Sequence, residues 1–429
     1  MVSLSNHRRA WRGALFALFI ALTTLPASAQ TAPALFNVQL YGAKGDGIAD
    51  DTQAFAAARD AAAAAGGGVI YAPHVHAFYR VSGCPALNFA STVPLTLRGD
   101  GRFLTIIQTS SPACDIVSVN QSRFTIESLS LDCVTQCTAG QALAFRSGSF
   151  VRAYDLWFGF QTFGDIAIGA PELARASSDK VTIESIDGHI AHAGGAGIDV
   201  ETGYSDIELR DVRLNCNEPA RRAGNAYGLR ARGSFDTLTM SGVYLQDCGY
   251  GMAFTPADGA IAEDIIGTNI ILDGMEQTAL LMRPQGVRAS GMVLRVTLDN
   301  LWAGAQGAPG GTSAVGILLD GGPRRTGVDG VRISNFTVPL AQTYGIALDR
   351  GNDPAFPMHA AFTGGSVSAW SHAAPGKYPA VAVGLTSPVD DVLFSGVATG
   401  AWAHVGTPES AARAYRIHPG SKHVRVEGP

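Results

Sequence analysis

Two short apolar segments, which begin 31 residues apart, carry matched pairs of charged residues: Asp199 and Glu201 in the first, Arg230 and Arg232 in the second. Carboxylates beside arginines suit two reactions on a polysaccharide. In elimination from a uronic-acid residue, arginines, with a calcium ion or a nearby base, neutralise the sugar carboxylate and remove the neighbouring proton. Hydrolysis needs two carboxylates, about 5 Å apart for retention or about 6.5 to 9.5 Å for inversion, and the spacing of Asp199 and Glu201 fits the second range.

The same four residues also fit a purely structural interpretation. On a parallel sheet, carboxylates and arginines of adjacent strands often form solvent-exposed ion pairs, each worth less than about 1 kcal/mol. Replacing a member of such a pair would leave the melting temperature almost unchanged. The sequence leaves both interpretations open.

The elements that position these residues are short apolar strands, each beginning with a glycine or an alanine. They span residues 197–201, 228–232, 251–255, 279–283, 316–320 and 345–349. Repeats of 20 to 50 residues built from short strands are typical of a solenoid, because each coil buries its apolar face only by stacking on its neighbours. We therefore expect one all-β, single-stranded, parallel β-helix domain over residues 30–429.

Alternation along each strand predicts two outward-facing ladders on one exposed sheet. The first contains Asp199, Arg230, Ala253, Leu281, Leu318 and Ala347. The second contains Glu201, Arg232, Thr255, Arg283, Asp320 and Asp349. Neighbouring strands are about 4.8 Å apart, and residues two apart on one strand are about 6.6 Å apart. The four charged residues should therefore form one compact patch.

The N-terminal part of the chain contains a distinctive run of turns around a helix. Its motifs are Tyr41-Gly42-Ala43-Lys44-Gly45-Asp46-Gly47, Asp50-Asp51-Thr52, Gly66-Gly67-Gly68-Val69-Ile70-Tyr71 and Tyr79-Arg80-Val81-Ser82-Gly83. We expect the alanine-rich segment between them to be a helix from Thr52 to Ala65, with Asp50 as the N-cap and Gln53 completing a capping box. The glycines after it end the helix.

These motifs resemble the N-terminal signature of the pectate lyase superfamily, which includes polygalacturonases, rhamnogalacturonases, mannuronan epimerases and phage tailspike depolymerases. The resemblance implies a right-handed parallel β-helix in which residues 36–83 form the first coil and its capping helix. It also implies an exported protein that cleaves an acidic polysaccharide, by elimination in preference to hydrolysis because arginines flank the carboxylates. A non-catalytic polysaccharide-binding β-helix is the alternative, since the catalytic motifs of polygalacturonases and the Asp-Pro-His-Glu motif of mannuronan epimerases are absent.

Further residues are candidates for substrate contacts. His189 and His192 precede Asp199 and could supply a base, while Glu218 and Arg221 lie in a loop that could clamp an anionic sugar, and Arg283 continues the second ladder. Aromatic residues that could stack on a pyranose face are Trp157, Tyr227, Tyr250, Trp302, Trp370 and Trp402. Apart from calcium, no cofactor is expected, and the oligomeric state stays open, with a homotrimer as one alternative.

Composition points to export. Basic residues at positions 7–12 precede an apolar run over residues 14–25 and the sequence Ala27-Ser28-Ala29, so residues 1–29 read as a cleavable signal peptide. We expect a secreted or periplasmic protein without a membrane span after cleavage. The formal charge of −5 and the absence of a basic run argue against nucleic acid as a partner.

Six cysteines in an exported chain are candidates for disulfides. The favoured pairs are Cys84 with Cys114, Cys133 with Cys137, and Cys216 with Cys248, although the sequence alone allows fifteen pairings.

Overall fold

The computed structural model describes residues 33–173, 177–217, 224–286, 291–307, 314–323, 326–351, 358–367, 381–399 and 415–428. The expected signal peptide lies outside them, as do Glu218, Arg221, Trp370 and Trp402. The chain divides into two units, Met1–Ala34 and Leu35–Pro429, and the architecture below is that of the second. None of the helices in the described ranges is both long and apolar enough to cross a membrane.

The described residues form two parallel sheets, one of twelve strands and one of eighteen. The twelve-stranded sheet consists of β4 (Leu87–Phe89), β7 (Val117–Asn120), β9 (Leu143–Ser147), β11 (Ile166–Ile168), β13 (Ala196–Val200), β15 (Tyr227–Ala231), β17 (Tyr250–Phe254), β19 (Thr278–Met282), β21 (Val315–Asp320), β23 (Tyr344–Asp349), β26 (Val381–Leu385) and β29 (Tyr415–Arg416). The first half of the eighteen-stranded sheet consists of β1 (Leu35–Asn37), β2 (Gly68–Tyr71), β3 (Tyr79–Val81), β5 (Leu95–Arg98), β6 (Ile106–Thr109), β8 (Phe124–Cys133), β10 (Val151–Phe158), β12 (Ser178–Ile190) and β14 (Tyr204–Cys216). The second half consists of β16 (Thr237–Gln246), β18 (Ile261–Asp273), β20 (Met292–Ala303), β22 (Gly327–Val338), β24 (Ala360–Thr363), β25 (Ser366–Val367), β27 (Val392–Ser395), β28 (Ala398–Thr399) and β30 (Arg425–Glu427).

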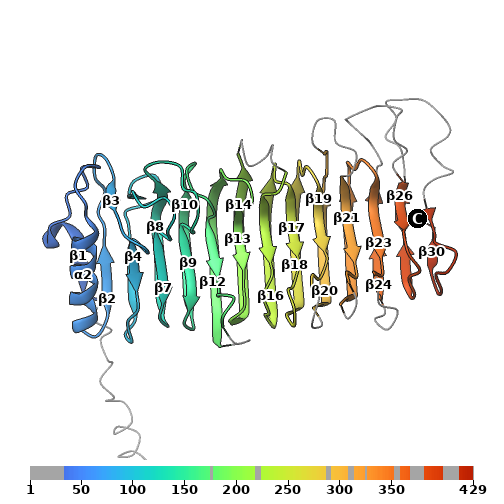
Figure 1. Ribbon diagram of the computed structural model, residues 1–429, viewed down its shortest axis with the longest axis horizontal. Coiled ribbons are helices and arrows are strands. Elements are labelled where there is room, and N and C mark those ends of the chain that lie inside the picture. Colours follow the sequence, from blue (N-terminus) through green and yellow to red (C-terminus); the bar gives the residue numbers. More distant parts are fainter. Residues whose placement is uncertain are drawn as a thin grey trace, which may run out of the picture. The chain divides into compact units, whose positions relative to one another are not determined.

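The chain alternates between the two sheets, so that each coil stacks on the one before it. Strand β12 pairs with β14 in the larger sheet, while β13, which connects them, pairs with β15 in the smaller one. The same order of strands is visible along the solenoid in Figure 1. The prediction of a parallel β-helix is therefore confirmed.

The long strands of the eighteen-stranded sheet bend at residues with positive φ. Asp211, Asn269 and Asn300 have φ angles of 48°, 54° and 53°, a conformation that aspartate and asparagine tolerate better than most residues. Each bend divides a strand into two segments that face different directions, and the C-terminal segments carry an outward surface of their own.

Inward-facing residues of the smaller sheet form a continuous apolar core. Ile198, Leu229, Met252, Leu280, Ile317 and Ile346 are each fully buried, and they pair in successive register. The glycines that begin these strands make room for the other sheet. A Cβ on Gly197 would lie 2.5 Å from Leu214, which explains why a small residue is required there.

The N-terminal end carries helix α2 (Thr52–Ala64), which lies beside β1 and β2 (Figure 1) and buries Phe55 and Ala58. Its N-cap is Asp51, so the expected cap at Asp50 is wrong. The Asp51 carboxylate turns away from the helix and accepts hydrogen bonds from the backbone amides of Lys44 (2.7 Å) and Gly45 (3.1 Å). The cap position thus fixes the glycine-rich turn before the helix.

All three predicted disulfides are present: Cys84–Cys114, Cys133–Cys137 and Cys216–Cys248. Two of them join neighbouring coils, with sequence separations of 30 and 32 residues. The separation matches the length of a coil, because cysteines one coil apart stand side by side.

Candidate functional site

Strands β13 and β15 bring the four predicted charged residues into one cluster, called the charge patch below. Asp199 pairs directly with Arg230 in the sheet register. Arg230 donates from Nε to Asp199 Oδ1 (3.1 Å) and from Nη2 to Oδ2 (2.6 Å). Arg232 donates from one nitrogen, Nη2, to Asp199 Oδ2 (2.8 Å) and to Glu201 Oε1. One guanidinium therefore bridges both carboxylates.

The charge patch is more buried than its place on an outward-facing ladder predicts. Asp199 is 3% exposed and Glu201 is 8% exposed, and their ladder neighbours Ala253 and Leu281 are also buried. The expectation of an exposed sheet face is wrong here, because alternation along a strand says which way a side chain points but not what covers it. Only the Arg232 side chain, at 42% exposure, is substantially open to solvent.

Burial changes the energetics of these ion pairs. Removing one partner from a buried pair leaves an uncompensated charge and costs about 3–5 kcal/mol, whereas a surface pair contributes at most about 1 kcal/mol. Because Asp199 is the partner of both arginines, the expectation that its replacement leaves stability unchanged no longer holds.

The two carboxylates are close together. Arg232 Nη2 donates both to Asp199 Oδ2, at 2.8 Å, and to Glu201 Oε1. Because the two carboxylate oxygens share one donor nitrogen, they are less than twice 2.8 Å apart. This separation is shorter than the roughly 6.5 to 9.5 Å that inverting hydrolysis uses. The arrangement in this state does not favour the inverting geometry.

Electrostatics make Glu201 a weaker acid than an ordinary glutamate. Burial raises the pKa of Glu201, and the negative charge of Asp199 raises it further, while Arg232, Arg230 and Arg146 act in the opposite direction. Burial lowers the pKa of the Arg230 guanidinium, but its hydrogen bonds and attraction to Asp199 raise it by more. Glu201 is thus a proton acceptor with a raised pKa that accepts a hydrogen bond from the Arg232 guanidinium.

Arg146 on β9 is a charged neighbour that the sequence analysis missed. It forms an ion pair with Asp115 (2.7 Å) and influences Glu201 electrostatically. Extending the register of β9, β11 and β13 by one residue places Gly169 between Arg146 and Glu201, so no side chain separates the two charged groups. Continuing the predicted ladder two coils towards the N-terminus would have found this residue.

Two tyrosines next to the charge patch pack on each other rather than forming an open platform. The rings of Tyr227 and Tyr250 stack at 4.9 Å, and the guanidinium carbon of Arg230 lies 4.9 Å above the Tyr227 ring. The Tyr250 hydroxyl donates to Gln277 Oε1 (2.7 Å). The tyrosine pair therefore supports Arg230 from below.

The remaining predicted residues lie in other surroundings. Arg283 forms an ion pair with Asp320 (2.7 Å) on the second ladder. His189 stacks on Phe160 with 4.1 Å between ring centroids, and His192 packs against Phe163 at 4.8 Å. Neither histidine contacts the charge patch within the described chain, and Glu218 and Arg221 stay predictions.

Across the ranges that the structure describes, no group of three or more His, Cys, Asp or Glu side chains is arranged to hold a metal ion. The charge patch contributes only two carboxylates, and both are already bound by arginine. A calcium ion thus stays a prediction of the sequence.

Comparisons with known proteins point to one family. The family described as "Rhamnogalacturonase A/epimerase, pectate lyase-like" matches residues 35–253, slightly more than half of the chain. Mannuronan C5-epimerase AlgE6 of Azotobacter vinelandii is 33% identical over 183 residues, 41% of this chain and 18% of that protein. Alginate lyase 7 of the same organism is 58% identical over 48 residues, 11% of this chain. The chain spans only about a twentieth (5%) of the length of that lyase.

Among solved structures, the A-module of mannuronan C-5 epimerase AlgE4 from Azotobacter vinelandii superposes with a TM-score of 0.56. The alignment covers 92% of this chain and 100% of that module, at 18% sequence identity. At this level of identity the likeness establishes the fold.

Proposed function

The chain belongs to the rhamnogalacturonase A/epimerase, pectate lyase-like family, and from this premise we propose that it is a polysaccharide-modifying enzyme that acts on uronate residues at the charge patch, by β-elimination. The observation that carries the proposal is the Arg232 guanidinium, which bridges two buried carboxylates and is itself partly open to solvent.

The names of the relatives indicate the type of chemistry. One is a C5-epimerase and another is a lyase. Inversion at C5 of a uronate requires breaking the C5–H bond, and so does elimination across C4 and C5. Both reactions therefore begin with neutralisation of the sugar carboxylate and removal of the adjacent proton, which arginines and a carboxylate base can provide.

Each member of the charge patch has a role in this scheme. Arg232, the most exposed member, binds the sugar carboxylate, and Glu201 accepts the C5 proton because its raised pKa makes it a better base than an ordinary glutamate. Asp199 and Arg230 hold Arg232 in position through their own hydrogen bonds. The C4–C5 double bond forms as the C4–O bond breaks, and the leaving oxygen takes a proton from water.

A panel of uronate polymers tests the proposal. We expect wild-type protein to generate the ultraviolet absorbance of unsaturated uronates and Glu201→Gln to lose it. Because Glu201 must be deprotonated to act, the rate should increase with pH as the pKa of this residue, which lies above its usual value, is passed.

Other outcomes would identify a different activity. New reducing ends without the absorbance would indicate a hydrolase, and altered C5 configuration in the NMR spectrum of uncleaved polymer would indicate an epimerase. Binding with no chemical change would support a non-catalytic polysaccharide-binding protein.

A further inference from the structure

A second outward surface lies on the C-terminal segments of the long strands, away from the charge patch. One residue of each strand, from β10 to β22, stands in direct register with the next. These residues, called the aromatic strip below, are Trp157, Asp187, Arg213, Tyr244, Ile271, Trp302 and Thr337.

The aromatic strip combines three aromatic rings with polar side chains and one isoleucine over a considerable length. Five strand spacings separate Trp157 from Trp302, which corresponds to about 24 Å at about 4.8 Å each. Tyr244 lies between them, with Asp187 and Arg213 on the intervening strands. A linear chain of several units, rather than a single small molecule, matches this pattern.

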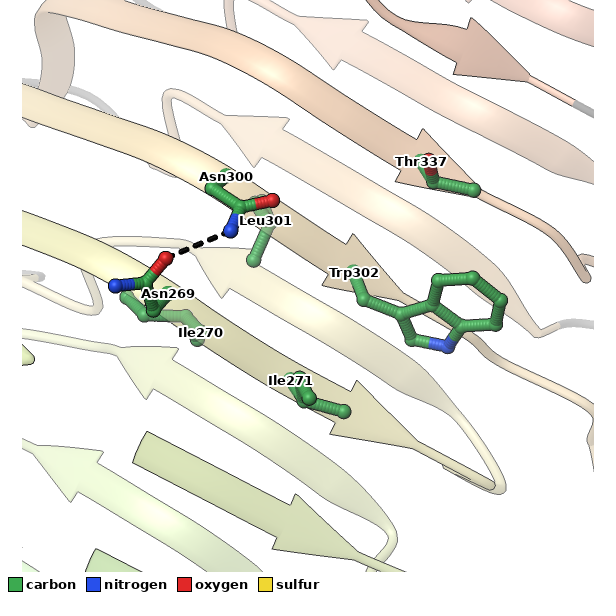
Figure 2. A pocket seen from close by; sticks show the side chains of 7 residues that line it. All are labelled: Asn269, Ile270, Ile271, Asn300, Leu301, Trp302 and Thr337. Atoms are coloured by element: carbon green, nitrogen blue, oxygen red, sulfur yellow. Dashed lines mark hydrogen bonds between the residues drawn. The ribbon is translucent and has the colours of Figure 1, made fainter. Parts of the chain in front are cut away.

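The C-terminal part of the aromatic strip is hollowed. A depression of about 600 Å³ is lined by Arg213, Gly242, Val243, Tyr244, Asn269, Ile271, Asp273 and Trp302. A neighbouring hollow of about 210 Å³ continues past Trp302 to Thr337 (Figure 2). Figure 2 shows Ile271 and Trp302 projecting from adjacent strands, beside the hydrogen-bonded pair Asn269–Asn300 (2.7 Å). Ile271 is 43% exposed and Trp302 is 40% exposed, so apolar surface is available to a ligand.

Hydrogen-bonding groups lie at the edge of the Trp302 ring. The position that a Cβ on Gly304 would occupy is 3.4 Å from both Asp273 Oδ1 and Trp302 Nε1. The glycine therefore leaves open the space between an indole N–H donor and a carboxylate acceptor. Sugars present apolar ring faces bordered by hydroxyl groups, and an aromatic ring with a donor and an acceptor at its edge complements both.

The charges of the aromatic strip favour a neutral sugar over a uronate. Arg102 is engaged by Asp155 (3.0 Å) and Asp187 (2.7 Å), and the Arg213 guanidinium carbon lies 5.3 Å over the ring of Tyr244. Arg213 and Asp273 both line the depression, so their opposite charges give a carboxylate no net attraction. The Asp273 carboxylate can accept hydrogen bonds from the hydroxyl groups of a neutral sugar.

We propose that the aromatic strip binds a neutral glycan chain, with pyranose rings packed on the exposed apolar surface of Ile271 and Trp302. This site is separate from the charge patch and does not depend on the reaction proposed there. It would hold the protein on a neutral polymer while the charge patch meets its own substrate.

Affinity electrophoresis through gels that contain soluble neutral polysaccharides (mixed-linkage β-glucan, glucomannan, galactomannan or xyloglucan) tests the proposal. At least one polymer should retard the wild-type protein. Trp302→Ala and Ile271→Ala should weaken that retardation on the order of ten-fold, because each removes stacking surface. Ile266→Ala is the matched control, since Ile266 lies on the same strand as Ile271 and is 50% exposed but does not belong to the strip.

Three results would overturn the assignment. The first is the absence of retardation by every neutral polymer, and the second is equal weakening by Ile266→Ala. The third is wild-type self-association in analytical ultracentrifugation that Trp302→Ala abolishes, which would make a second copy of the chain the occupant. Uronate turnover, measured on the same variants, should not change, so the two proposals can fail independently.

Discussion

Two buried aspartates, one at the N-terminal cap and one in the charge patch, are held in contrasting ways. Asp51 is 2% exposed and accepts hydrogen bonds from the backbone amides of Lys44 and Gly45. Asp199 is 3% exposed, and its partners are the side chains of Arg230 and Arg232. Residue type and burial are the same, but the donors differ.

This difference in hydrogen-bond donors distinguishes a carboxylate that only stabilises the fold from one that belongs to a binding site. Backbone donors are fixed by the course of the chain, so a carboxylate bound to them can only stabilise that course. Guanidinium groups are carried on flexible side chains and offer five N–H donors each, so Arg232 can hold a protein carboxylate and still present donors to a ligand. Replacing the cap carboxylate should therefore affect stability alone, whereas replacing a carboxylate of the charge patch should affect activity as well as stability.

The largest expected effect is that of Asp199→Asn. Loss of the charge that positions both arginines should reduce turnover of a uronate polymer on the order of 100-fold or more. It should also lower the free energy of unfolding by about 3–5 kcal/mol, since two guanidinium groups lose their buried partner. Initial rates and urea unfolding measure the two effects.

A paired variant sharpens that test. Arg98→Ala removes an arginine of the larger sheet, whose ion pair with Glu127 is more exposed, and it should leave turnover within a few-fold of wild type. Wild-type turnover by folded Asp199→Asn protein would show that the charge patch is architectural like the cap.

At the cap, Asp51→Ala should affect stability alone. Two backbone amides lose their acceptor, so the free energy of unfolding should fall by about 1–3 kcal/mol, while the rate per folded molecule stays unchanged. Urea unfolding and activity at a temperature where the variant is folded measure this. A loss of turnover without a loss of stability would contradict the division of roles.

The cap was easier to predict than the surroundings of the charge patch. Glycines in the sequence indicate the tight turn before the helix. Gly42, Gly45 and Gly47 have φ angles of 104°, 60° and 72°, which other residues rarely adopt. The charge patch followed from the repeat alone: once Ile198 and Leu229 point inward, Asp199 and Arg230 must be neighbours on the other face.

The sequence carries no comparable signal for the burial of the sheet face that contains Asp199. Arg230 and Arg232 contact Asp199 and Glu201, and alternation within a strand does not encode how far such neighbouring side chains bury a carboxylate. The N-cap was misplaced by one residue because Asp50 and Asp51 are adjacent and both can accept from backbone amides. Asp50 in fact binds the backbone amide of Thr52 (2.9 Å) and the hydroxyl of Ser82.

Asp165 is a third buried aspartate, and among the described residues its carboxyl group is bound neither by backbone amides, as in Asp51, nor by arginines, as in Asp199. It is fully buried, its Oδ1 lies 2.9 Å from the Thr162 hydroxyl, and its Oδ2 has no partner in the described part of the chain. Burial raises the pKa of Asp165 well above the usual value, and the negative charge of Asp132 adds to the increase. The folded state therefore favours the protonated form.

The sign of the pH dependence follows from that pKa. The stabilising contribution of protonated Asp165 is complete below the unfolded pKa, near 3.8, and is lost as the pH rises through the folded pKa, by about 1.4 kcal/mol for each unit between the two. Asp165→Asn should lack this loss, so its stability relative to wild type should increase from pH 3 to pH 8. Parallel urea titrations that show an unchanged difference would contradict the assignment.

The smallest expected effect concerns Arg146, which adjusts the charge patch without contacting its carboxylates in the described hydrogen bonds. The positive charge of Arg146 lowers the pKa of Glu201, so Arg146→Ala should raise that pKa and move the rising limb of the pH–rate profile to higher pH. The rate at high pH, where Glu201 is deprotonated in both proteins, should change only a few-fold. Arg152→Ala is the control, because Arg152 pairs with Glu184 on the larger sheet and should leave the profile in place. A profile that shifts equally in both variants, or in neither, would remove Glu201 from the role of base, because a base at that position must respond to a charge across the gap that Gly169 leaves open.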